Sequence, residues 1–226
     1  MHFNKFGPFW KKKDSDRQVC LLFHPRKKKM STKEKGVKDR ILETAVRLFQ
    51  TQGYGNTGIN QIIQESQTAK ASFYDYYPSK DLLGKAYIEF YGKEQIILLE
   101  KLRSRSQNAR DFIQAWTHIL KRQTRNSEFA GCPMANTAAQ IASSSPSISE
   151  EVKKLVLRTV EFLSIYLKEM QKKGQIPKNA DTQSLARKIF ACYEGVLQIW
   201  KLTGKISALD DLPEMVDAII KSSGKK

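Results

Sequence analysis

Hydrophobic residues recur at spacings of three and four along the chain from Lys35 onward, and no segment shows the two-residue alternation that is typical of a strand. The first amphipathic segment ends at Gly53. One of its faces carries the apolar residues Val37, Ile41, Ala45, Leu48 and Phe49. Two short helices are predicted next, over 59–66 and 68–77, and Pro78 ends the second. This pattern predicts an all-α fold.

Longer helices are predicted after Pro78, and they bring the total to about nine. Ser147 and Glu150 have the spacing of a capping box before one of them. Ser79 is placed to cap a helix whose apolar face includes Leu82, Leu83, Ala86, Tyr87, Phe90, Ile97 and Leu98. Further helices are expected over 109–125, from Pro133, over 147–173, over 181–203 and over 211–221.

The composition is that of a globular protein, with 40% hydrophobic and 27% charged residues in a chain of 226. No apolar run approaches the roughly 20 residues that are needed to span a bilayer. The three cysteines, Cys20, Cys132 and Cys192, give neither a disulfide framework nor a metal-ligand spacing. The sequence therefore predicts a cytoplasmic protein with no membrane partner, no bound metal and no cofactor.

Positive charge is concentrated at the N-terminus. Residues 1–29 hold nine Lys and Arg against Asp14 and Asp16, in a chain whose net charge is +16. This stretch has no helical or strand period, which indicates a disordered basic tail. The tail either adds non-specific affinity for phosphate or precedes the true start at Met30, and the pattern favours the second interpretation. The predicted division of the chain is a tail over 1–32, domains over 33–83 and 84–222, and a short tail over 223–226.

Two short helices that follow a longer amphipathic helix, joined by a turn of about three residues, form the outline of a helix-turn-helix. One face of the third helix must then lie in the major groove, so its side chains cannot all be buried. Phe73 and Tyr77 are four residues apart and are expected to pack inward. The phenol groups of Tyr74 and Tyr76 suit contacts with phosphate, although the alternative is that both are half-buried core residues.

The N-terminal half of the third helix is slim, which lets its backbone approach base edges, because Ala69, Ala71 and Ser72 carry small side chains. Lys80 is placed to pair with a phosphate at the start of the next helix. The candidate DNA contacts are Thr57, Asn60, Thr68, Ala69, Lys70, Ala71, Ser72, Tyr74, Tyr76 and Lys80.

Residues 40–83 read RILETAVRLFQTQGYGNTGINQIIQESQTAKASFYDYYPSKDLL. This stretch resembles the DNA-binding domain of TetR-type (TetR/AcrR) transcriptional repressors, and the match covers about residues 36–83. The family pattern is a helix, G-(Y/F)-x-x-T, a short helix, then (S/P)-K-G-(S/T)-(L/F)-Y-x-(H/Y)-F-x-(S/N)-K-x-x-L. Two positions depart from it. Gln67 stands where the turn between the helices usually has Gly, with a modest strain cost if its backbone is left-handed. Ala71 replaces the Gly that the family usually has at this position.

The resemblance implies a homodimer that reads a palindromic operator in double-stranded DNA with two copies of the third helix. It implies that the three-helix DNA-binding domain is followed by a larger helical domain for ligand binding and dimerisation. The helices at 181–203 and 211–221 would form the dimer interface, and the middle of the chain would hold a signal-binding chamber.

The stretches GCPMAN (131–136) and YEGVLQIWKLTGKISALDDL (193–212) resemble a branch of that family that includes the N-ethylmaleimide reductase repressor and YxaF- and LmrA-like regulators. Cys132 precedes Pro133 at a helix start, where free N–H groups and the helix dipole favour a thiolate and lower the thiol pKa. In the electrophile-sensing members of that branch the matching Cys is reactive, and the resemblance places Lys201 close to it. The alternative is that Cys132 is a small buried hydrophobe, and both interpretations stay open.

Aromatic residues at helical spacing in the second half would line the chamber, although most such residues are plain core. Glu194 interrupts an otherwise apolar helix face and is expected at an interface or a pocket. The possible lining residues are Phe90, Trp116, His118, Phe162, Tyr166, Tyr193 and Trp200. The candidate sensor residues are Cys132, Lys201, Trp116, Phe162, Tyr166 and Tyr193.

The sequence favours a dimeric repressor that leaves its operator when a small-molecule inducer binds or an electrophile modifies Cys132. One alternative is an enzyme that uses Cys132 as nucleophile and His118 as base, but no motif supplies an orienting group or an oxyanion hole, so no catalytic residue is expected. The other alternative is a non-specific nucleic-acid binder that depends on the basic tail.

Overall fold

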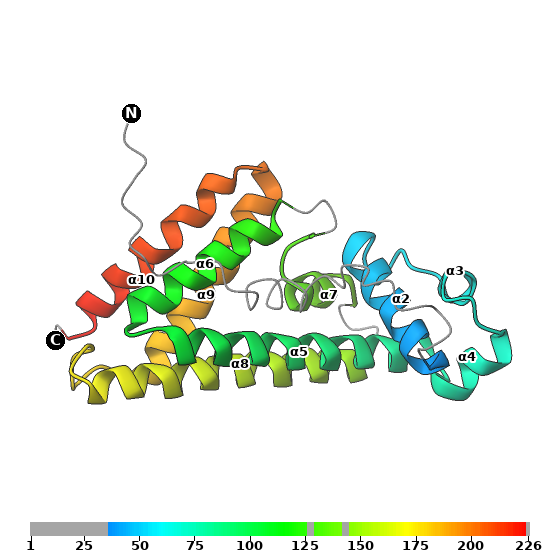
Figure 1. Cartoon of the computed structure of the whole chain (residues 1–226), viewed down its shortest axis with the longest axis horizontal. Helices are drawn as coiled ribbons and strands as arrows, with labels where there is room; N and C mark the ends of the chain where they lie inside the picture. Colours follow the sequence, from blue (N-terminus) through cyan, green and yellow to red (C-terminus); the bar gives the residue numbers. More distant parts are fainter. Residues whose placement is uncertain (1–35, 126–128, 142–144, 225–226) are drawn as a thin grey trace.

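The computed structural model describes residues 36–125, 129–141 and 145–224. The predicted basic tail over 1–32, the alternative start at Met30 and Cys20 lie outside the described residues. Within the described ranges every regular element is a helix, nine α-helices and one short 3₁₀ helix, which confirms the predicted all-α fold. The first three helices occupy one end of the molecule, and the C-terminal helix reaches the other end (Figure 1).

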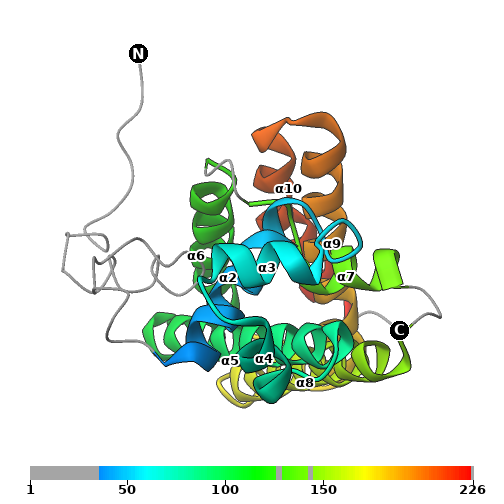
Figure 2. The same ribbon diagram turned by 90° about the vertical axis from the view of Figure 1, so that its right-hand side faces the viewer.

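The first three helices are α2 (Val37–Thr51), α3 (Ile59–Glu65) and α4 (Lys70–Tyr76), close to the predicted ranges. The predicted inward face of α2 is confirmed, because Ile41, Ala45, Leu48 and Phe49 are all buried. The helices α3 and α4 lie in front of the rest of the molecule when it is viewed from this end (Figure 2). The sequence periodicity was therefore sufficient to define this unit.

The two longest helices, α5 (Lys80–Arg105) and α8 (Pro146–Lys172), lie side by side (Figure 1). Their hydrogen-bonded partners are separated by 64, 64 and 66 residues along the chain. Since this separation is almost constant, the two helices run parallel. The three pairs, from the start of both helices to the end, are Asp81 with Ser145, Gln95 with Thr159, and Arg103 with Glu169.

The other helices build the C-terminal half around this pair. Helix α9 packs on both α8 and α10, and α10 also packs on α6. Helix α7 lies between the C-terminal helices and the first three helices (Figure 1). Their bounds are α6 Ala109–Gln123, α7 Pro133–Ile141, α9 Thr182–Thr203, the 3₁₀ helix Ile206–Asp210, and α10 Asp211–Ser222.

Most predicted helix starts are confirmed, but the capping box is wrong. The Ser79 hydroxyl accepts from the Leu82 N–H at 3.1 Å, as a capping residue should. Helix α8 begins at Pro146, one residue before the expected Ser147, because a proline suits the first turn of a helix. The residue before it, Ser145, makes no capping bond and donates its hydroxyl to Asp81 at 2.7 Å.

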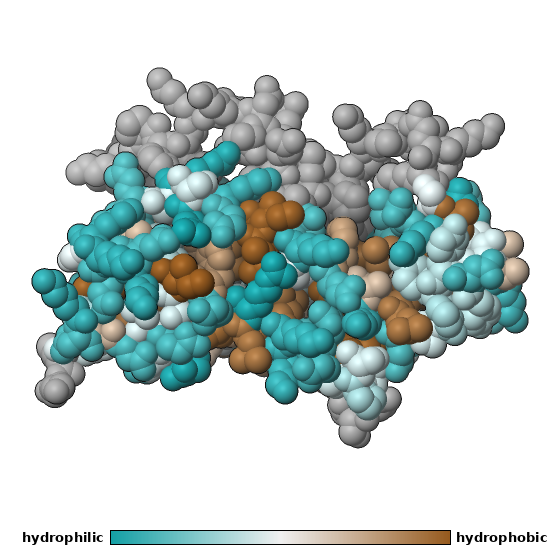
Figure 3. Space-filling model, turned by 90° about the horizontal axis from the view of Figure 1, so that it is seen from below, coloured by the Kyte–Doolittle hydropathy of each residue, from teal (hydrophilic) through white to brown (hydrophobic). Residues whose placement is uncertain are grey.

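The apolar face expected for α5 needs a correction, because three of its residues are exposed. Leu82, Phe90 and Ile97 have exposed fractions of 45%, 37% and 42%. Helix α5 contacts α2, α6, α7 and α8 at different points of its length, so its buried side turns around the axis and follows no single stripe. The surface seen from below mixes hydrophilic and hydrophobic side chains (Figure 3).

Candidate nucleic-acid interface and interior cluster

The core of the first three helices holds the third helix, α4, in place. Phe73 and Tyr77 are buried, with exposed fractions of 0% and 4%, as the sequence predicted. They contact each other at a ring distance of 6.4 Å, and Ile41 and Ile62 belong to the same core. Burial of these two rings fixes the rotation of α4 and so decides which of its side chains face outward.

The turn between α3 and α4 depends on Gln67, whose φ of 53° lies in the left-handed region. Gln67 is the only described residue other than glycine with a positive φ, which confirms the expected backbone conformation. The Gln67 N–H donates to the Gln64 carbonyl at 3.2 Å, and Arg40 donates to the Gln67 carbonyl at 3.4 Å. One backbone bond and one bond from the Arg40 guanidinium therefore hold the turn through the Gln67 backbone, while the Gln67 side chain stays exposed.

The outward side of α3 and α4 carries most of the candidate DNA contacts. Tyr74 and Tyr76 are exposed at 40% and 47%, although Phe73, directly before Tyr74, is fully buried. Thr68, Ser72 and Lys80 are partly buried. The exposed candidates are Asn60, Ala69, Lys70, Ala71, Tyr74 and Tyr76. These groups present small, cationic and phenolic side chains on one end of the molecule, the set that base edges and phosphates require.

Thr57 and Lys80 are placed differently from the expectation. Thr57 is buried, and its hydroxyl donates to the Gly53 carbonyl at 2.7 Å, so it organises the turn after α2. The Lys80 amine lies 4.4 Å from the centre of the Tyr54 ring and donates to the Gly55 carbonyl at 3.5 Å. Burial also lowers the pKa of Lys80. Both residues therefore support the same turn from inside.

A junction between the two halves of the chain was not foreseen from the sequence. The Tyr54 hydroxyl donates to one oxygen of Asp81 at 2.6 Å, and Ser145 donates to the other at 2.7 Å. These bonds hold the pKa of Asp81 below its usual range, Tyr54 having the larger effect. The Gly55 N–H donates to the Gln140 side chain at 2.9 Å. Tyr54 and Gly55 belong to the helix-turn-helix, whereas Gln140 and Ser145 belong to the second half.

Cys132 does not have the lowered pKa that its helix-start position suggested. The backbone N–H groups of Met134 and Ala135 do lower the pKa of its thiol, as expected there. Two larger effects oppose this lowering. Burial raises the pKa of the thiol most, and the Glu194 carboxylate, which the thiol contacts by a hydrogen bond, also raises it. The net effect is a pKa well above the usual value, because Cys132 is only 4% exposed. The thiol is therefore protonated in this conformation.

Lys201, in the last turn of α9, extends its side chain to the start of α7, where its amine has a partner other than the thiol. The amine donates to the Asn136 side chain, whose own amide donates to the Ala130 carbonyl at 2.8 Å. The Lys201 stem passes Gly131, whose φ is 94°. The resemblance correctly placed Lys201 next to the Cys132 segment, while the hydrogen-bond partner of the thiol is Glu194.

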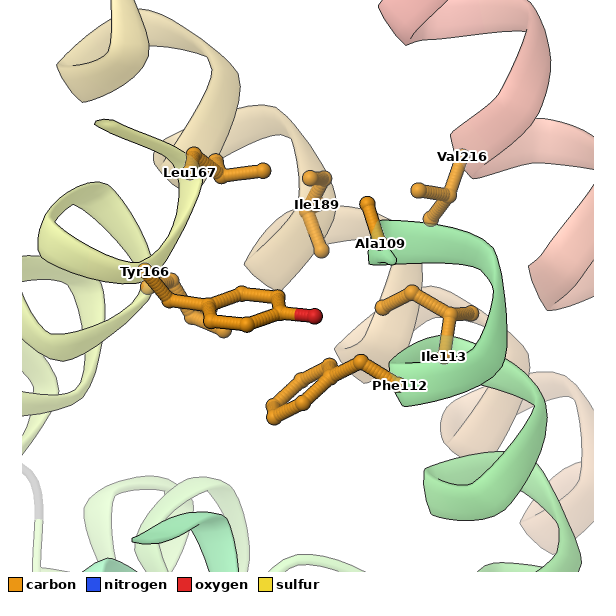
Figure 4. A pocket seen from close by; sticks show the side chains of 8 residues that line it. Ala109, Phe112, Ile113, Tyr166, Leu167, Ile189 and Val216 are labelled. Atoms are coloured by element: carbon orange, nitrogen blue, oxygen red, sulfur yellow. The ribbon is translucent and has the colours of Figure 1, made fainter. Parts of the chain in front are cut away.

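The aromatic residues that were expected to line a chamber pack against one another, so their rings occupy the space of the expected chamber. Trp116 stacks on Tyr193 with ring centres 4.3 Å apart, and Phe112 lies 4.5 Å from Tyr166. Beside them is an apolar cavity of about 10 Å³, lined by Ala109, Phe112, Ile113, Leu163, Tyr166, Leu167, Ile189 and Val216 (Figure 4). Drug-sized ligands need pockets of about 300–1,000 Å³, so a ligand must move these side chains.

The remaining chamber candidates differ in their burial. Phe90 and His118 are exposed, whereas Phe162 is buried. Trp200 is partly buried and stacks on Phe129 with ring centres 5.4 Å apart. His118, the base of the enzyme alternative, is therefore exposed on α6, while the proposed nucleophile Cys132 is buried against Glu194.

The described part of the chain contains neither a candidate metal site nor a candidate membrane span. Its His, Cys, Asp and Glu residues form no group of three or more that could hold a metal ion. None of its helices is both long and apolar enough to cross a membrane.

Comparison with known proteins identifies the family. Residues 41–87 match the model of the bacterial regulatory proteins of the tetR family, and residues 107–216 match the tetracyclin repressor-like C-terminal domain. The regulator LmrA of Bacillus subtilis is 31% identical over 142 residues, which cover 61% of this chain and 72% of LmrA. This chain belongs to the TetR family. It is therefore a DNA-binding transcriptional regulator, as the helix-turn-helix predicted.

Other TetR relatives match almost their whole length. The uncharacterized regulator YxaF of Bacillus subtilis is 26% identical over 190 residues, covering 83% of this chain and 96% of YxaF. The repressor NemR of Escherichia coli is 23% identical over 189 residues, covering 83% of this chain and 95% of NemR. The crystal structure of reduced NemR superimposes with a TM-score of 0.72 over 82% of this chain and 97% of NemR. These matches confirm the branch to which the sequence was similar.

Proposed function

We propose that the protein is a homodimeric repressor that reads a palindromic operator with α4 and is released by a signal received in its C-terminal half. The observation that carries the proposal is the division of α4 into a buried side with Phe73 and an exposed side with Lys70, Ala71 and Tyr74. The exposed side carries few bulky groups before Tyr74, which suits insertion into the major groove. Repression follows if the bound dimer blocks access to a promoter.

The dimer would form through α9 and α10. In the single chain, Ile199 and Leu202 on α9 are exposed at 53% and 75%, and Met215 on α10 at 40%. Ala191 and Gly195, on the same side of α9, are also exposed and would let a partner helix approach closely. Pairing α9 and α10 with their symmetry mates would bury this face in a four-helix arrangement.

The junction at Asp81 supports a coupling between the two halves. The Asp81 carboxylate accepts hydrogen bonds from both Tyr54 and Ser145, and the Gln140 side chain accepts one from the Gly55 N–H. Gln140 lies in the last turn of α7, near the turn after α2, and Cys132 directly precedes the first residue of the same helix. A shift of α7 would therefore change the orientation of the helix-turn-helix, and two copies of α4 would no longer match grooves about 34–36 Å apart.

The signal would be a small molecule that displaces the packed aromatic residues around Trp116 and Tyr193. A second candidate is an electrophile that reacts with Cys132, favoured by the Met134 and Ala135 N–H groups directed at its sulfur. Burial opposes this reaction, so the segment would have to open first. Binding to chromosomal DNA would place the protein in the cytoplasm.

Operator affinity tests the proposal. Fluorescence anisotropy would compare a palindrome from DNA flanking the gene with a scrambled duplex of equal length. We expect wild type to prefer the palindrome by about a thousandfold or more. Lys70→Ala should weaken binding and lower the salt dependence by about one counterion, whereas Lys168→Ala, exposed on α8, should leave both unchanged.

Equal affinity for both duplexes, lost on deletion of residues 1–29, would support the non-specific binder instead. The same assay after treatment with N-ethylmaleimide would compare wild type with Cys132→Ser. Release of wild type alone identifies Cys132 as the sensor. Equal behaviour of the two proteins assigns the signal to a bound molecule.

A further inference from the structure

Glu194 is a partly buried acidic side chain in the C-terminal half. It lies on α9, beside the buried residues Tyr193 and Val196. The Cys132 thiol forms a hydrogen bond with its carboxyl group. The carboxyl oxygen Oε1 is buried and has no hydrogen-bond partner among the described residues. A buried polar atom without a partner costs stability, so its presence calls for an explanation. One explanation is a ligand that completes the site.

The described residues supply no positive charge for this carboxyl group. Burial raises the pKa of Glu194, and the Cys132 hydrogen bond lowers it by less. Lys201 is the nearby base on the same helix, yet its amine is bound to Asn136. A buried carboxylate without a counter-ion is unfavourable, which is the reason for the raised pKa. A positive charge that pairs with this carboxylate would therefore come from outside the described residues.

Two tyrosines lie near the same position. Electrostatic interactions link Glu194 to Tyr91 on α5 and to Tyr193 on α9. Tyr193 in turn stacks with Trp116 at 4.3 Å and with Phe190 at 5.9 Å. Electron-rich ring faces attract cations, and the attraction is strongest where water is excluded. A carboxylate among such rings is the chemistry that recognises an organic cation.

We propose that Glu194 and the rings of Tyr91, Trp116 and Tyr193 bind an organic cation, an amine or quaternary ammonium attached to an aromatic group. This inference rests on the proposed function, because it names the chemical class of the inducer. Phe112 lines the small cavity of Figure 4 and lies 5.9 Å from Trp116, so an aromatic series connects that cavity with Glu194. The aromatic group of the ligand would enlarge this cavity by moving Trp116.

The test uses two probes of the same shape. Benzyltrimethylammonium carries the charge, and neopentylbenzene has carbon in place of its nitrogen. Binding to the full-length protein without DNA would be measured by calorimetry and by tryptophan fluorescence. We expect wild type to bind the cation at least about tenfold more tightly than its neutral isostere, a factor equivalent to about 1.4 kcal/mol.

Glu194→Gln keeps an oxygen for the Cys132 thiol and removes the charge. It should weaken binding of the cation about tenfold and leave the neutral isostere unchanged. The control is Glu161→Gln on the exposed side of α8, which should bind both probes as wild type does. Equal affinity of wild type for the two probes, no binding of either, or an unchanged cation affinity in Glu194→Gln would overturn the inference.

Stability supplies a second measurement. The folded-state pKa of Glu194 is raised, so protonation favours the folded state, and stability declines as the pH rises above the ordinary carboxyl pKa. The titratable groups facing Glu194 are Cys132, Tyr91 and Tyr193. Glu194→Gln should therefore unfold at a higher temperature than wild type at pH 8, with the difference vanishing near pH 4. A lower unfolding temperature at pH 8 would show a structural role and overturn the inference.

The operator assay separates this inference from the proposed function. Glu194→Gln should bind the palindrome as tightly as wild type, since Glu194 is remote in sequence and structure from α4. Specific operator binding together with failure of the cation test would leave the repressor proposal intact and remove only the ligand class.

Discussion

In the helix-turn-helix, Phe73 and Tyr77 are buried while their neighbours Tyr74 and Tyr76 remain exposed at 40% and 47%. In the C-terminal half, Trp116 and Tyr193 are buried together and stack on each other. In the first region, the buried rings thus fix the position of α4, and the exposed rings present their hydroxyl groups at the surface. The second uses them to fill an interior that also contains ionisable groups.

The difference reflects what each region has to recognise. DNA is larger than the protein domain that binds it, so its site must be an exposed and preformed surface. A small inducer, as proposed above, would be enclosed, so its site would be an interior that opens. The three predictions below test this contrast between a rigid surface and an adaptable interior, and they run from the largest expected effect to the smallest.

Trp116→Ala should lower the free energy of unfolding by about 3–5 kcal/mol, because it removes a large buried ring and leaves a cavity. Trp116 is 2% exposed and contacts both Phe112 and Tyr193. Urea denaturation followed by circular dichroism measures the change. The matched control is Leu157→Ala on α8, 60% exposed, with an expected change within about 0.5 kcal/mol. A decrease of less than about 1 kcal/mol in the free energy of unfolding of Trp116→Ala would mean that the neighbouring side chains collapse into the cavity at little energetic cost.

Asp81→Asn should lower the free energy of unfolding by about 1–2 kcal/mol, because an amide has one oxygen for the two donors Tyr54 and Ser145. The folded-state pKa of Asp81 is lowered, so its contribution is complete above the ordinary pKa of about 4 and disappears as the pH falls through the lower folded value. Denaturation of both proteins from pH 7 to pH 2 measures this convergence.

The control for Asp81 is Asp75→Asn, since the Asp75 carboxyl is exposed on α4. It should change the stability by less than about 0.5 kcal/mol at any pH. If Asp81→Asn behaves like this control, the junction does not join the two regions energetically.

Gln67→Gly should raise the free energy of unfolding by about 0.5 kcal/mol. Glycine removes a left-handed strain of about 1–2 kcal/mol, and its greater backbone freedom in the unfolded chain offsets roughly half of that. The bond from the Gln67 N–H to Gln64 and the bond from the Arg40 side chain to the Gln67 carbonyl are kept, because both use backbone groups of residue 67. Thermal unfolding compares wild type with Gln67→Gly and with Gln67→Ala, which retains the strain and should match wild type. A destabilised glycine variant would show that the Gln67 side chain itself holds the turn.

The helix-turn-helix was predictable because its signals are local. The helical period, the stop at Gly53 and Pro78 and the cap at Ser79 lie within a few residues of the elements they define. The burial of Phe73 and Tyr77 follows from their four-residue spacing on one helix. Thr57 shows the limit of such reasoning, because a hydroxyl looks the same in sequence whether it binds DNA or the Gly53 carbonyl.

The interior cluster was only partly predictable because its members come from distant helices. Glu194 was visible as an acid on an apolar face, but nothing in the sequence paired it with Cys132, 62 residues earlier. The position of Cys132 before Pro133 correctly indicated N–H groups near the sulfur. It gave the wrong direction for the pKa, since that depends on burial and on a charge from another helix.

The sequence by itself determined an all-helical chain, the order and approximate bounds of its helices, and the DNA-binding unit at its start. Those properties depend on periodicity and on capping residues within one or two helical turns. The tertiary structure decided that Asp81 ties Tyr54 to Ser145, that α5 and α8 run parallel, and that Glu194 meets the Cys132 thiol away from water. Electrostatic and hydrogen-bonding environments depend on which helices meet, and that is settled only when the whole chain packs.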